Sequence, residues 1–410
     1  MKKSNLFLTV LFALLVLASC SDDNGYTVTT RPVPDLIKIE LNETEKQQVQ
    51  TNNEFAFNLS RKVYNENKND NFLISPLSAT YVLAMLENGS NGETQQQILS
   101  ALRFDKEESM NAVCGKLIAG ASKVDASTEV DVANGLFLDK SVPFKADYMK
   151  TMASTYGAEV KNLDFSDQQT ALKAINSWSN EKTKGKIPTI IKNLSNNTKI
   201  AALNAIYFKG KWNIEFDSNN TSKETFTHAD GIKTQVDMMK VKDNFLFGAF
   251  SKFDMLHMAY GNNGYSMEVL LPREGVSIAD VLNSIKSADW QKTMMAMDDY
   301  EADVQLPKFT IDYSVDMQPV LKALGMTDMF DTSKADFSRL SDVKTVVGLF
   351  TQKCTIDVNE KGTEATTTTI ATNGDMANVV PTTEFHANRP FIYLITENTT
   401  GAIYFIGIYR

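Results

Sequence analysis

The chain has 410 residues and a formal net charge of −9, with 43% hydrophobic and 22% charged residues. This composition is typical of a globular protein and excludes a disordered, collagen-like or disulfide-scaffold chain. The acidic balance argues against a protein that mainly binds nucleic acid or anionic membranes, because both favour clustered Lys and Arg. We therefore expect no nucleic-acid partner.

The first residues have the pattern of a targeting segment. Lys2 and Lys3 precede an apolar run over residues 6–18, which is too short to span a bilayer as a helix. The run ends in the string LASC at residues 17–20, which resembles the lipobox of bacterial lipoproteins, where the Cys is acylated. This resemblance implies a signal peptide over residues 1–19, a fatty-acyl anchor such as palmitate on Cys20, and a place on a bacterial cell envelope. The alternative is a plain secretory peptide with an incidental Cys.

The residues after the anchor read as a tether and a folded body. Residues 20–42 are polar, contain two prolines and lack periodicity, which is typical of a linker. The acidic residues at its start resemble the export signal of some surface lipoproteins and imply exposure on the outer membrane. The folded domain is predicted over residues 43–410. Its two cysteines, Cys114 and Cys354, are expected to be buried, unreactive thiols.

Helical periodicity comes early in the domain and β-type runs come later. Helices are predicted at residues 45–67, 76–102 with a break at Gly89 and Gly92, and 171–186. Strands are predicted at residues 201–208, 266–271, 304–311, 343–358, 391–395 and 402–409, the last two joined by a turn at 398–401. Helices followed by strands favour an α+β fold over a βαβ repeat.

The sequence lacks the usual signatures of enzymes. There is no G-x-S-x-G, P-loop, H-E-x-x-H, C-x-x-C or G-x-G-x-x-G string. The three histidines, His228, His257 and His386, are scattered, and none has the spacing of a metal ligand. We expect no enzymatic activity, no cofactor and no metal.

One segment is unusual on physical grounds. Glu360-Lys361-Gly362 ends a strand pattern and leads into a Thr-rich stretch that has no charge, Pro or Gly from residue 365 to 372. Its β-branched residues favour a strand. Alternate residues would share one face, and all are small enough to lie under another layer; they are Thr363, Ala365, Thr367 and Thr369. The segment is either a strand held in reserve or a Thr-rich linker or edge strand, and composition alone favours the linker or edge strand.

Blocks spread over the chain resemble the serpin family and follow its order. The most specific of them reads NAIYFKGKW at Asn204–Trp212. The others are Asn71–Ser78, Asn134–Phe137, Asn176–Ile187, Leu306–Phe309, Leu324–Met326, Ala335–Ser338 and Phe385–Phe391. The resemblance covers residues 45 to 410. It favours a strand held in reserve, and not a linker or edge strand, as the interpretation of the Thr-rich segment.

The resemblance implies a serpin fold with three β-sheets, eight or nine helices and an exposed reactive-centre loop. It implies suicide-type inhibition of serine proteases, with cysteine proteases as a further class. The protease forms an acyl-enzyme with the loop, the cut loop inserts into sheet A, and the protease is deformed before water releases it. The hinge of the loop would comprise Glu360, Gly362, Thr363, Ala365, Thr367 and Thr369. No Pro or inward-facing charge obstructs insertion, so the protein is predicted to be inhibitory.

Two further sites follow from the resemblance. The breach, where insertion begins, would contain Lys308, Trp212 and Glu360. The shutter, beneath the centre of sheet A, would contain Asn71, Ser75, Ser78, Asn204 and Gln352. The family usually has His at the position of Gln352. Gln can donate and accept hydrogen bonds, but it cannot titrate near neutral pH.

The scissile bond follows from loop length. Fourteen residues after Gly362 stands Met376, which gives Met376-Ala377 as the reactive bond, with its neighbours or Val379-Val380 as alternatives. An unbranched apolar Met suits proteases with a hydrophobic primary pocket, of the elastase, chymotrypsin or subtilisin type. Trypsin-like enzymes are not expected targets, because their pocket carboxylate favours Lys or Arg.

Partners other than a protease and the membrane lipid are not expected. Residues 101–120, near the helix that carries heparin activation in animal relatives, lack a basic cluster, so no heparin binding is predicted. The protein is expected to be a monomer. The alternative function is a non-inhibitory serpin-fold protein, a surface binding or chaperone-like module, which a charged or Pro-bearing hinge would favour.

Overall fold

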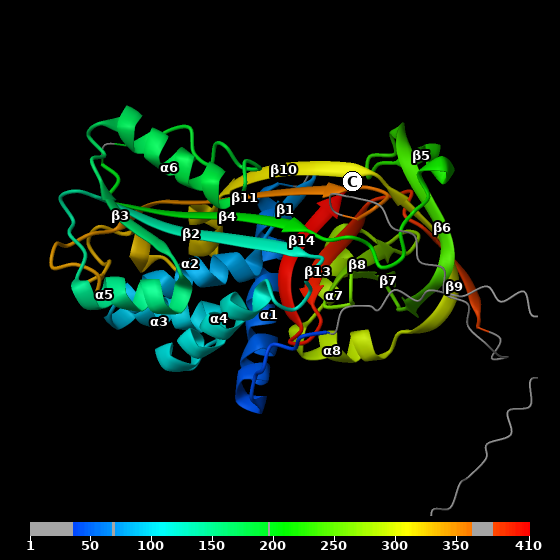
Figure 1. The fold of residues 1–410 in the computed structure, drawn as a ribbon, viewed down its shortest axis with the longest axis horizontal. Helices are drawn as coiled ribbons and strands as arrows, with labels where there is room; N and C mark the ends of the chain where they lie inside the picture. The colour runs from blue at the N-terminus through cyan, green and yellow to red at the C-terminus, as the bar shows by residue number, and fades with distance from the viewer. Residues whose placement is uncertain (1–35, 68–69, 196, 363–379) are drawn as a thin grey trace, which may run out of the picture. The chain divides into compact units, whose positions relative to one another are not determined.

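The structure, a computed structural model, describes residues 36–67, 70–195, 197–362 and 380–410. The expected signal peptide, Cys20 and most of the tether lie outside the described residues. So do the hinge positions Thr363, Ala365, Thr367 and Thr369 and the Met376-Ala377 bond. The described part contains nine α-helices and fourteen strands (Figure 1).

Five strands form a sheet in the order β10-β11-β4-β2-β3. Their bounds are β2 (Glu129–Asp139), β3 (Glu159–Leu163), β4 (Ile200–Lys209), β10 (Phe309–Asp316) and β11 (Val347–Val358). β4 and β11 are parallel to each other, and their outer neighbours β2 and β10 are antiparallel to them. Nine of the ten residues of β4 are buried, which is expected of a strand with both faces covered.

Nine strands form a second hydrogen-bonded network, in which β6 is shared between two parts. Its residues 233–238 pair with β5, residues 238–247 pair with β9, and the last four, Leu246–Ala249, pair with β7. Hydrogen bonds thereby join the second and third of the three expected sheets into one network. The strands are β1 (Phe72–Ile74), β5 (Ser222–Thr227), β6 (Lys233–Ala249), β7 (Phe253–Tyr260), β8 (Tyr265–Pro272), β9 (Asp298–Pro307), β12 (Thr382–His386), β13 (Phe391–Glu397) and β14 (Ala402–Tyr409).

Helices cover both faces of the five-stranded sheet (Figure 1). α2 is buried over its whole length between this sheet and β14, and its N-terminal Ser75 caps the backbone N–H of Ser78. α6 lies on the opposite face, where Trp178 packs edge-on against Phe137. The bounds are α1 (Glu43–Glu66), α2 (Pro76–Gly89), α3 (Gly92–Leu102), α4 (Glu107–Ala121), α5 (Ala146–Thr151), α6 (Gln168–Lys182), α7 (Ile278–Ser284), α8 (Ser287–Met295) and α9 (Met317–Ala323).

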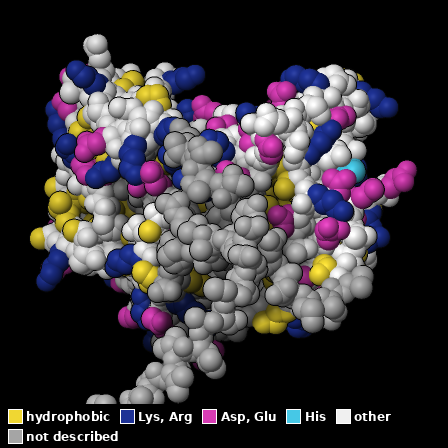
Figure 2. Space-filling view, turned by 45° about the vertical axis from the view of Figure 1, so that its right-hand side comes forward, with side chains coloured by type: hydrophobic (Ala, Val, Ile, Leu, Met, Phe, Trp, Pro, Cys, Tyr) yellow, Lys and Arg dark blue, Asp and Glu magenta, His cyan; other side chains and the backbone are white. Residues whose placement is uncertain are grey.

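Two hydrophobic clusters form the core. The larger one lies between the two sheets and among α1–α4, and a smaller one lies between α6 and the five-stranded sheet. Both cysteines are free and buried, as predicted, and burial raises the pKa of each thiol. Figure 2 shows acidic and basic side chains intermixed over one face of the molecule. No helix within the described ranges is long and apolar enough to cross a membrane.

Candidate functional site

The centre of the five-stranded sheet is a closed parallel pair of strands. β4 and β11 pair from Ile200 with Val347 to Tyr207 with Thr355. A strand that ran antiparallel to both could lie between them only if these backbone bonds opened. Parallel ladders are slightly less stable per residue than antiparallel ones, so such an exchange is favourable in its backbone pairing.

A tight turn reverses the chain at the end of β11. The backbone N–H of Asn359 donates to the carbonyl of Gly362 at 2.9 Å, and the Gly362 N–H donates back at 3.1 Å. Gly362 has a φ of 126°, and a Cβ there would lie 2.2 Å from the carbonyl oxygen of Gly210. Only glycine fits this backbone without displacing its neighbour. We call residues 359–362 the loop root.

Residues 210–216, which we call the clamp segment, hold the loop root. The backbone N–H of Trp212 donates to the Lys361 carbonyl at 3.0 Å, and its indole Nε1 donates to the Asn359 carbonyl at 2.9 Å. The N–H of Phe216 donates to the Glu360 carbonyl at 2.8 Å. Trp212 is buried and stacks on Tyr260 with ring centroids 4.4 Å apart. These three hydrogen bonds therefore dock the root on a buried aromatic pair.

The Glu360 carboxylate adds a charged contact. Its Oε2 lies 3.0 Å from Lys308 Nζ, and its Oε1 accepts from Thr221 Oγ1 at 2.9 Å. Burial alone would raise the pKa of this carboxyl, but hydrogen bonds from its own backbone, Lys308 and Thr221 outweigh burial and lower it. The structure thus brings together Lys308, Trp212 and Glu360, the three residues of the predicted breach.

A row of buried amides crosses the strand pair. Asn134 on β2, Asn204 on β4 and Gln352 on β11 are paired in register, so their side chains share one face. Gln352 Nε2 donates to Asn204 Oδ1 at 3.0 Å, and Asn204 Nδ2 donates to Asn134 Oδ1 at 2.8 Å. Because one of these bonds joins β4 to β11, the row ties the central pair closed.

The N-terminus of α2 completes this polar cluster. Gln352 Oε1 accepts from the Ser75 N–H at 2.9 Å, while its Nε2 donates to the Ser75 carbonyl at 2.8 Å. Asn204 Nδ2 also donates to Ser78 Oγ. All four of these residues have no exposed surface. Gln352 thus bonds to both the backbone N–H and the backbone carbonyl of Ser75. A neutral His could do so only in one tautomer.

The residues predicted for the shutter do not all take part in this cluster. Asn71 lies outside the cluster, because it precedes β1 and its Oδ1 accepts from the backbone N–H of Arg410 at 2.8 Å. Asn134 is a member that the sequence-based assignment missed. The available signal was a polar Asn in an otherwise apolar strand pattern, but its register with Asn204 is a tertiary fact.

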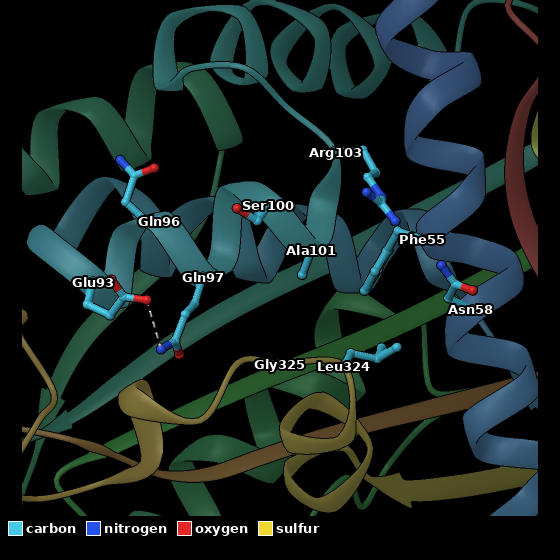
Figure 3. Close-up of a pocket in the computed structure, with 10 residues that line it drawn as sticks. All are labelled: Phe55, Asn58, Glu93, Gln96, Gln97, Ser100, Ala101, Arg103, Leu324 and Gly325. Carbon is cyan, nitrogen blue, oxygen red and sulfur yellow. Dashed lines mark hydrogen bonds between the residues drawn. The ribbon is translucent and has the colours of Figure 1, made fainter.

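Other features of the described residues do not belong to this site. A cavity of about 280 Å³ lies between α1, α3 and the turn after α9, where Gln97 donates to Glu93 (Figure 3). None of its ten lining residues belongs to the loop root or the amide row. Within the described ranges, no three His, Cys, Asp or Glu side chains are grouped so that they could hold a metal ion.

This arrangement defines a class of protein. A parallel strand pair lies closed at the centre of a covered sheet, and a clamped turn at one end leads into residues 363–379 before the chain returns at β12. The chain belongs to the serpin family: the family model for serpins (serine protease inhibitors) matches residues 50–410. The predicted α+β serpin fold is confirmed.

Curated relatives support the assignment. The leukocyte elastase inhibitor of Sus scrofa is 33% identical over 371 residues, which cover 87% of this chain and 97% of that protein. An uncharacterised serpin-like protein of Methanosarcina acetivorans is 29% identical over 97% of this chain and 94% of its own.

Solved structures agree with this. Tengpin, a thermophilic serpin in its native state, matches with a TM-score of 0.79 and 26% identity over 90% of this chain and 94% of its own. A complex of thyroxine-binding globulin with thyroxine matches with a TM-score of 0.80 and 28% identity over 88% and 98%.

Proposed function

We propose that this serpin is a suicide-type inhibitor that traps a protease as its acyl-enzyme by inserting the cut loop between β4 and β11. Membership of the family and similarity to leukocyte elastase inhibitors support protease inhibition in general. Serpins are generally not catalytic enzymes, and the proposed role needs no catalytic group of the chain itself. The single observation that carries the proposal is the closed parallel pair with a reversing turn at its end.

Insertion follows from the direction of the chain. The turn at 359–362 reverses β11, so a strand that continues it would run antiparallel to β11 and also to β4. Residues 365–372 are uncharged, lack Pro and Gly, and alternate small side chains on one face. The strand would separate Gln352 from Asn204, and two antiparallel ladders would replace one parallel ladder.

The target class rests on the residue before the proposed bond. Met376 suits a hydrophobic primary pocket, and the pig relative is named for its inhibition of leukocyte elastase. We therefore propose elastase-, chymotrypsin- or subtilisin-like proteases as targets and Met376-Ala377 as the reactive bond.

The test mixes residues 21–410 with elastase, chymotrypsin, subtilisin and trypsin. Denaturing gels and mass spectrometry would show an SDS-stable adduct with a hydrophobic-pocket enzyme and release of a peptide that begins at Ala377. The matched control is Thr369→Arg, which puts a charge on the inward face, so we expect cleavage without adduct. Cleavage of the wild-type protein without adduct by every enzyme would reject trapping.

That negative result would favour the alternative, a non-inhibitory binding or chaperone-like protein. Thyroxine-binding globulin is a structural relative whose name describes binding, so the fold is compatible with such a role. The sequence of the hinge favours inhibition, because neither Pro nor charge interrupts residues 365–372.

We also propose that the protein is anchored to a bacterial envelope through a lipid on Cys20, where it would protect surface proteins from host or competitor proteases. The supporting observation is the LASC string after an apolar run. Metabolic labelling with a palmitate analogue should label the wild-type protein and not Cys20→Ala. Equal labelling of both would reject the anchor.

A further inference from the structure

A closed ring of hydrogen bonds lies behind the clamp segment, in the part of the second network formed by β7, β8 and β13. Glu268 Oε1 and Oε2 lie 3.0 and 3.1 Å from His257 Nδ1, and Ser266 Oγ donates to Glu268 Oε1 at 2.6 Å. Asn263 Oδ1 lies 3.3 Å from His257 Nε2, and Asn398 bonds to both Asn263 and Ser266. We call these five residues the polar ring.

The ring contains a buried charge. The Glu268 side chain has no exposed surface, and the His257 side chain is 10% exposed. Burial alone would lower the pKa of His257, but the Glu268 carboxylate and the bond to Asn263 outweigh it and raise the pKa. A protonated His257 can donate from both ring nitrogens, which satisfies Glu268 and Asn263 together.

The surroundings of His257 add one other charge. It faces a cavity of about 210 Å³ in which Asp299 of β9 is the only other charged lining residue within the described ranges. The lining residues from β6 and from residues 212–214 are uncharged, and so is Thr396 of β13, which donates to Glu268. Of these acidic groups, the Glu268 carboxylate is the one that favours the charged form of His257.

The ring is connected to the loop root by an unbroken series of contacts. Asn263 and Gly261 belong to the turn between β7 and β8, which starts at Tyr260, the residue stacked on Trp212. The Gly261 N–H donates to the Lys211 carbonyl at 2.8 Å, and Asn213 donates to the Ala259 and Gly261 carbonyls at 2.9 and 2.8 Å. The turn thus docks the clamp segment, and the clamp segment docks residues 359–362.

We propose that His257 and Glu268 are positioning residues that hold the clamp segment on the loop root and restrain the loop from entering the sheet before a protease cuts it. This deepens the proposed function and rests on it, since a premature entry matters only if the sheet accepts the loop. Neither residue contacts the loop root itself. They act through Tyr260, Gly261 and Trp212.

The pH dependence has a definite sign. A group whose pKa is raised in the folded state stabilises it below its ordinary pKa and loses that effect as the pH rises through the folded value. Deprotonation of His257 leaves the Glu268 carboxylate buried without a charged partner, which loosens the ring. If the pKa of His257 is one unit lower when the ring is open than when it is closed, the equilibrium constant for opening is about tenfold higher at high pH than at low pH.

The experiment measures hydrogen–deuterium exchange of the Trp212 and Phe216 amides, which donate to the loop root, in the full-length protein from pH 6 to pH 9. In parallel, the fraction of uncut protein that becomes resistant to urea on incubation reports spontaneous loop entry. The variants are Glu268→Gln, which keeps the ring bonded to a neutral His, and His257→Gln. The controls are His228→Gln, a partly buried histidine on another turn, and Glu87→Gln, a buried acid with a pKa of about 7.

We expect exchange at both amides to rise with pH in the wild-type protein, beyond the intrinsic exchange rate, and equally in both controls. Loop entry should rise with pH equally in the wild-type protein and in His228→Gln. In Glu268→Gln and His257→Gln this rise with pH should be absent, so that exchange at both amides, corrected for the intrinsic rate, differs little between pH 6 and pH 9. The proposal is overturned if exchange in the wild-type protein does not rise with pH beyond the intrinsic rate. It is also overturned if Glu87→Gln removes this pH dependence and Glu268→Gln does not.

The exchange measurement requires no protease. A failure to form adducts would therefore reject the proposed function while the exchange profile still decides whether the ring positions the clamp segment.

Discussion

At the scale of the single residue, the loop root depends on the missing side chain of Gly362. Replacing it with Ala would place a Cβ 2.2 Å from the Gly210 carbonyl oxygen and 2.7 Å from the Trp212 nitrogen, both backbone atoms that cannot rotate away. Strained backbone of this kind costs about 1–3 kcal/mol. We expect Gly362→Ala to detach the root and to increase hydrogen exchange at the Trp212 and Phe216 amides.

The control for this prediction is Gly231→Ala. Gly231 also has a positive φ, 83°, but nothing lies within 4 Å of its Cβ position. It should therefore show only the backbone cost of about 1–2 kcal/mol and no change at the loop root. Equal effects of the two substitutions on the Trp212 amide would mean that close packing at Gly362 is unimportant.

Glu360 predicts an acid-sensitive contact. Its lowered pKa means that it stabilises the fold above its ordinary pKa and loses this effect as the pH falls through the lower folded value. Because Lys308 is 45% exposed, the pair is worth about 1 kcal/mol or less. Between pH 6 and pH 3, the unfolding temperature should fall less steeply in Glu360→Gln than in the wild type. Parallel curves would show that the carboxylate contributes no charge effect.

For Glu87 we expect a pH dependence of stability opposite in sign to that of Glu360. Its carboxyl is fully buried at the end of α2, and burial raises its pKa to about 7, despite a hydrogen bond from Gln95. The fold is stabilised by the neutral form and loses that effect as the pH rises through 7. Glu87→Gln should match the wild type at pH 4 and be more stable at pH 9 by up to about 3 kcal/mol in urea titrations. Equal stability at pH 9 would contradict a raised pKa.

Residue identity alone decided only part of the site. Trp212, Lys308 and Glu360 could be predicted because each stands in a specific string, and the structure brings them together. Nothing in the sequence is a reason to treat Asn71 differently from Ser75, which stands in the same string. In the structure, β1 lies between them, and only Ser75 reaches the amide row. Asn134 and the His257–Glu268 pair depend on strand register, which the sequence does not show.

At the scale of the element, the helices and strands that were predicted mostly lie within a few residues of the observed ones, whereas others, among them α4, α8 and the long strand β6, were not assigned from the sequence. Errors fall where a local signal ends an element inside an apolar pattern. The predicted strand 304–311 is two strands, because Pro307 ends β9 and the Lys308 N–H turns to the Asp237 carbonyl. The strand predicted from residue 343 starts four residues too early, because the chain bends at residues 342–343 and β11 begins only at Val347.

The contact between β4, β11 and α2 gives an element-scale prediction. Gln352 accepts from the Ser75 N–H and donates to the Ser75 carbonyl, so Gln352→His can replace it only while the ring is neutral. Protonation would turn the acceptor into a second donor facing an N–H. This lowers the folded pKa of the new His, so stability should be lost as the pH falls from 7 to 5, by about 1–3 kcal/mol for one buried unsatisfied group. The wild type should show no such loss at this site, and Gln352→His without extra acid sensitivity would contradict the geometry.

At the scale of the whole molecule, the sheet is closed around a parallel ladder. The two central strands are parallel, a polar row joins them, and the turn that could supply an antiparallel strand is clamped just beyond their end. The native arrangement can therefore persist because the clamp and the amide row must open first. The proposed insertion would make this stability kinetic, with a lifetime that depends on the barrier to opening.

Cutting the loop tests this view of the whole molecule directly. Once residues 363–376 are free at one end, insertion between β4 and β11 should add two antiparallel ladders, and the cut protein should unfold at least about 10 °C above the intact protein in a circular dichroism melt. Thr369→Arg cut by the same protease should stay near the unfolding temperature of its intact form, because the inward charge has no partner under the sheet. Its intact form should unfold like the intact wild type, since the substitution lies outside the clamped root. If cutting leaves the wild-type unfolding temperature unchanged, the parallel pair is the equilibrium arrangement, no energy is available to displace a protease, and the fold serves binding alone.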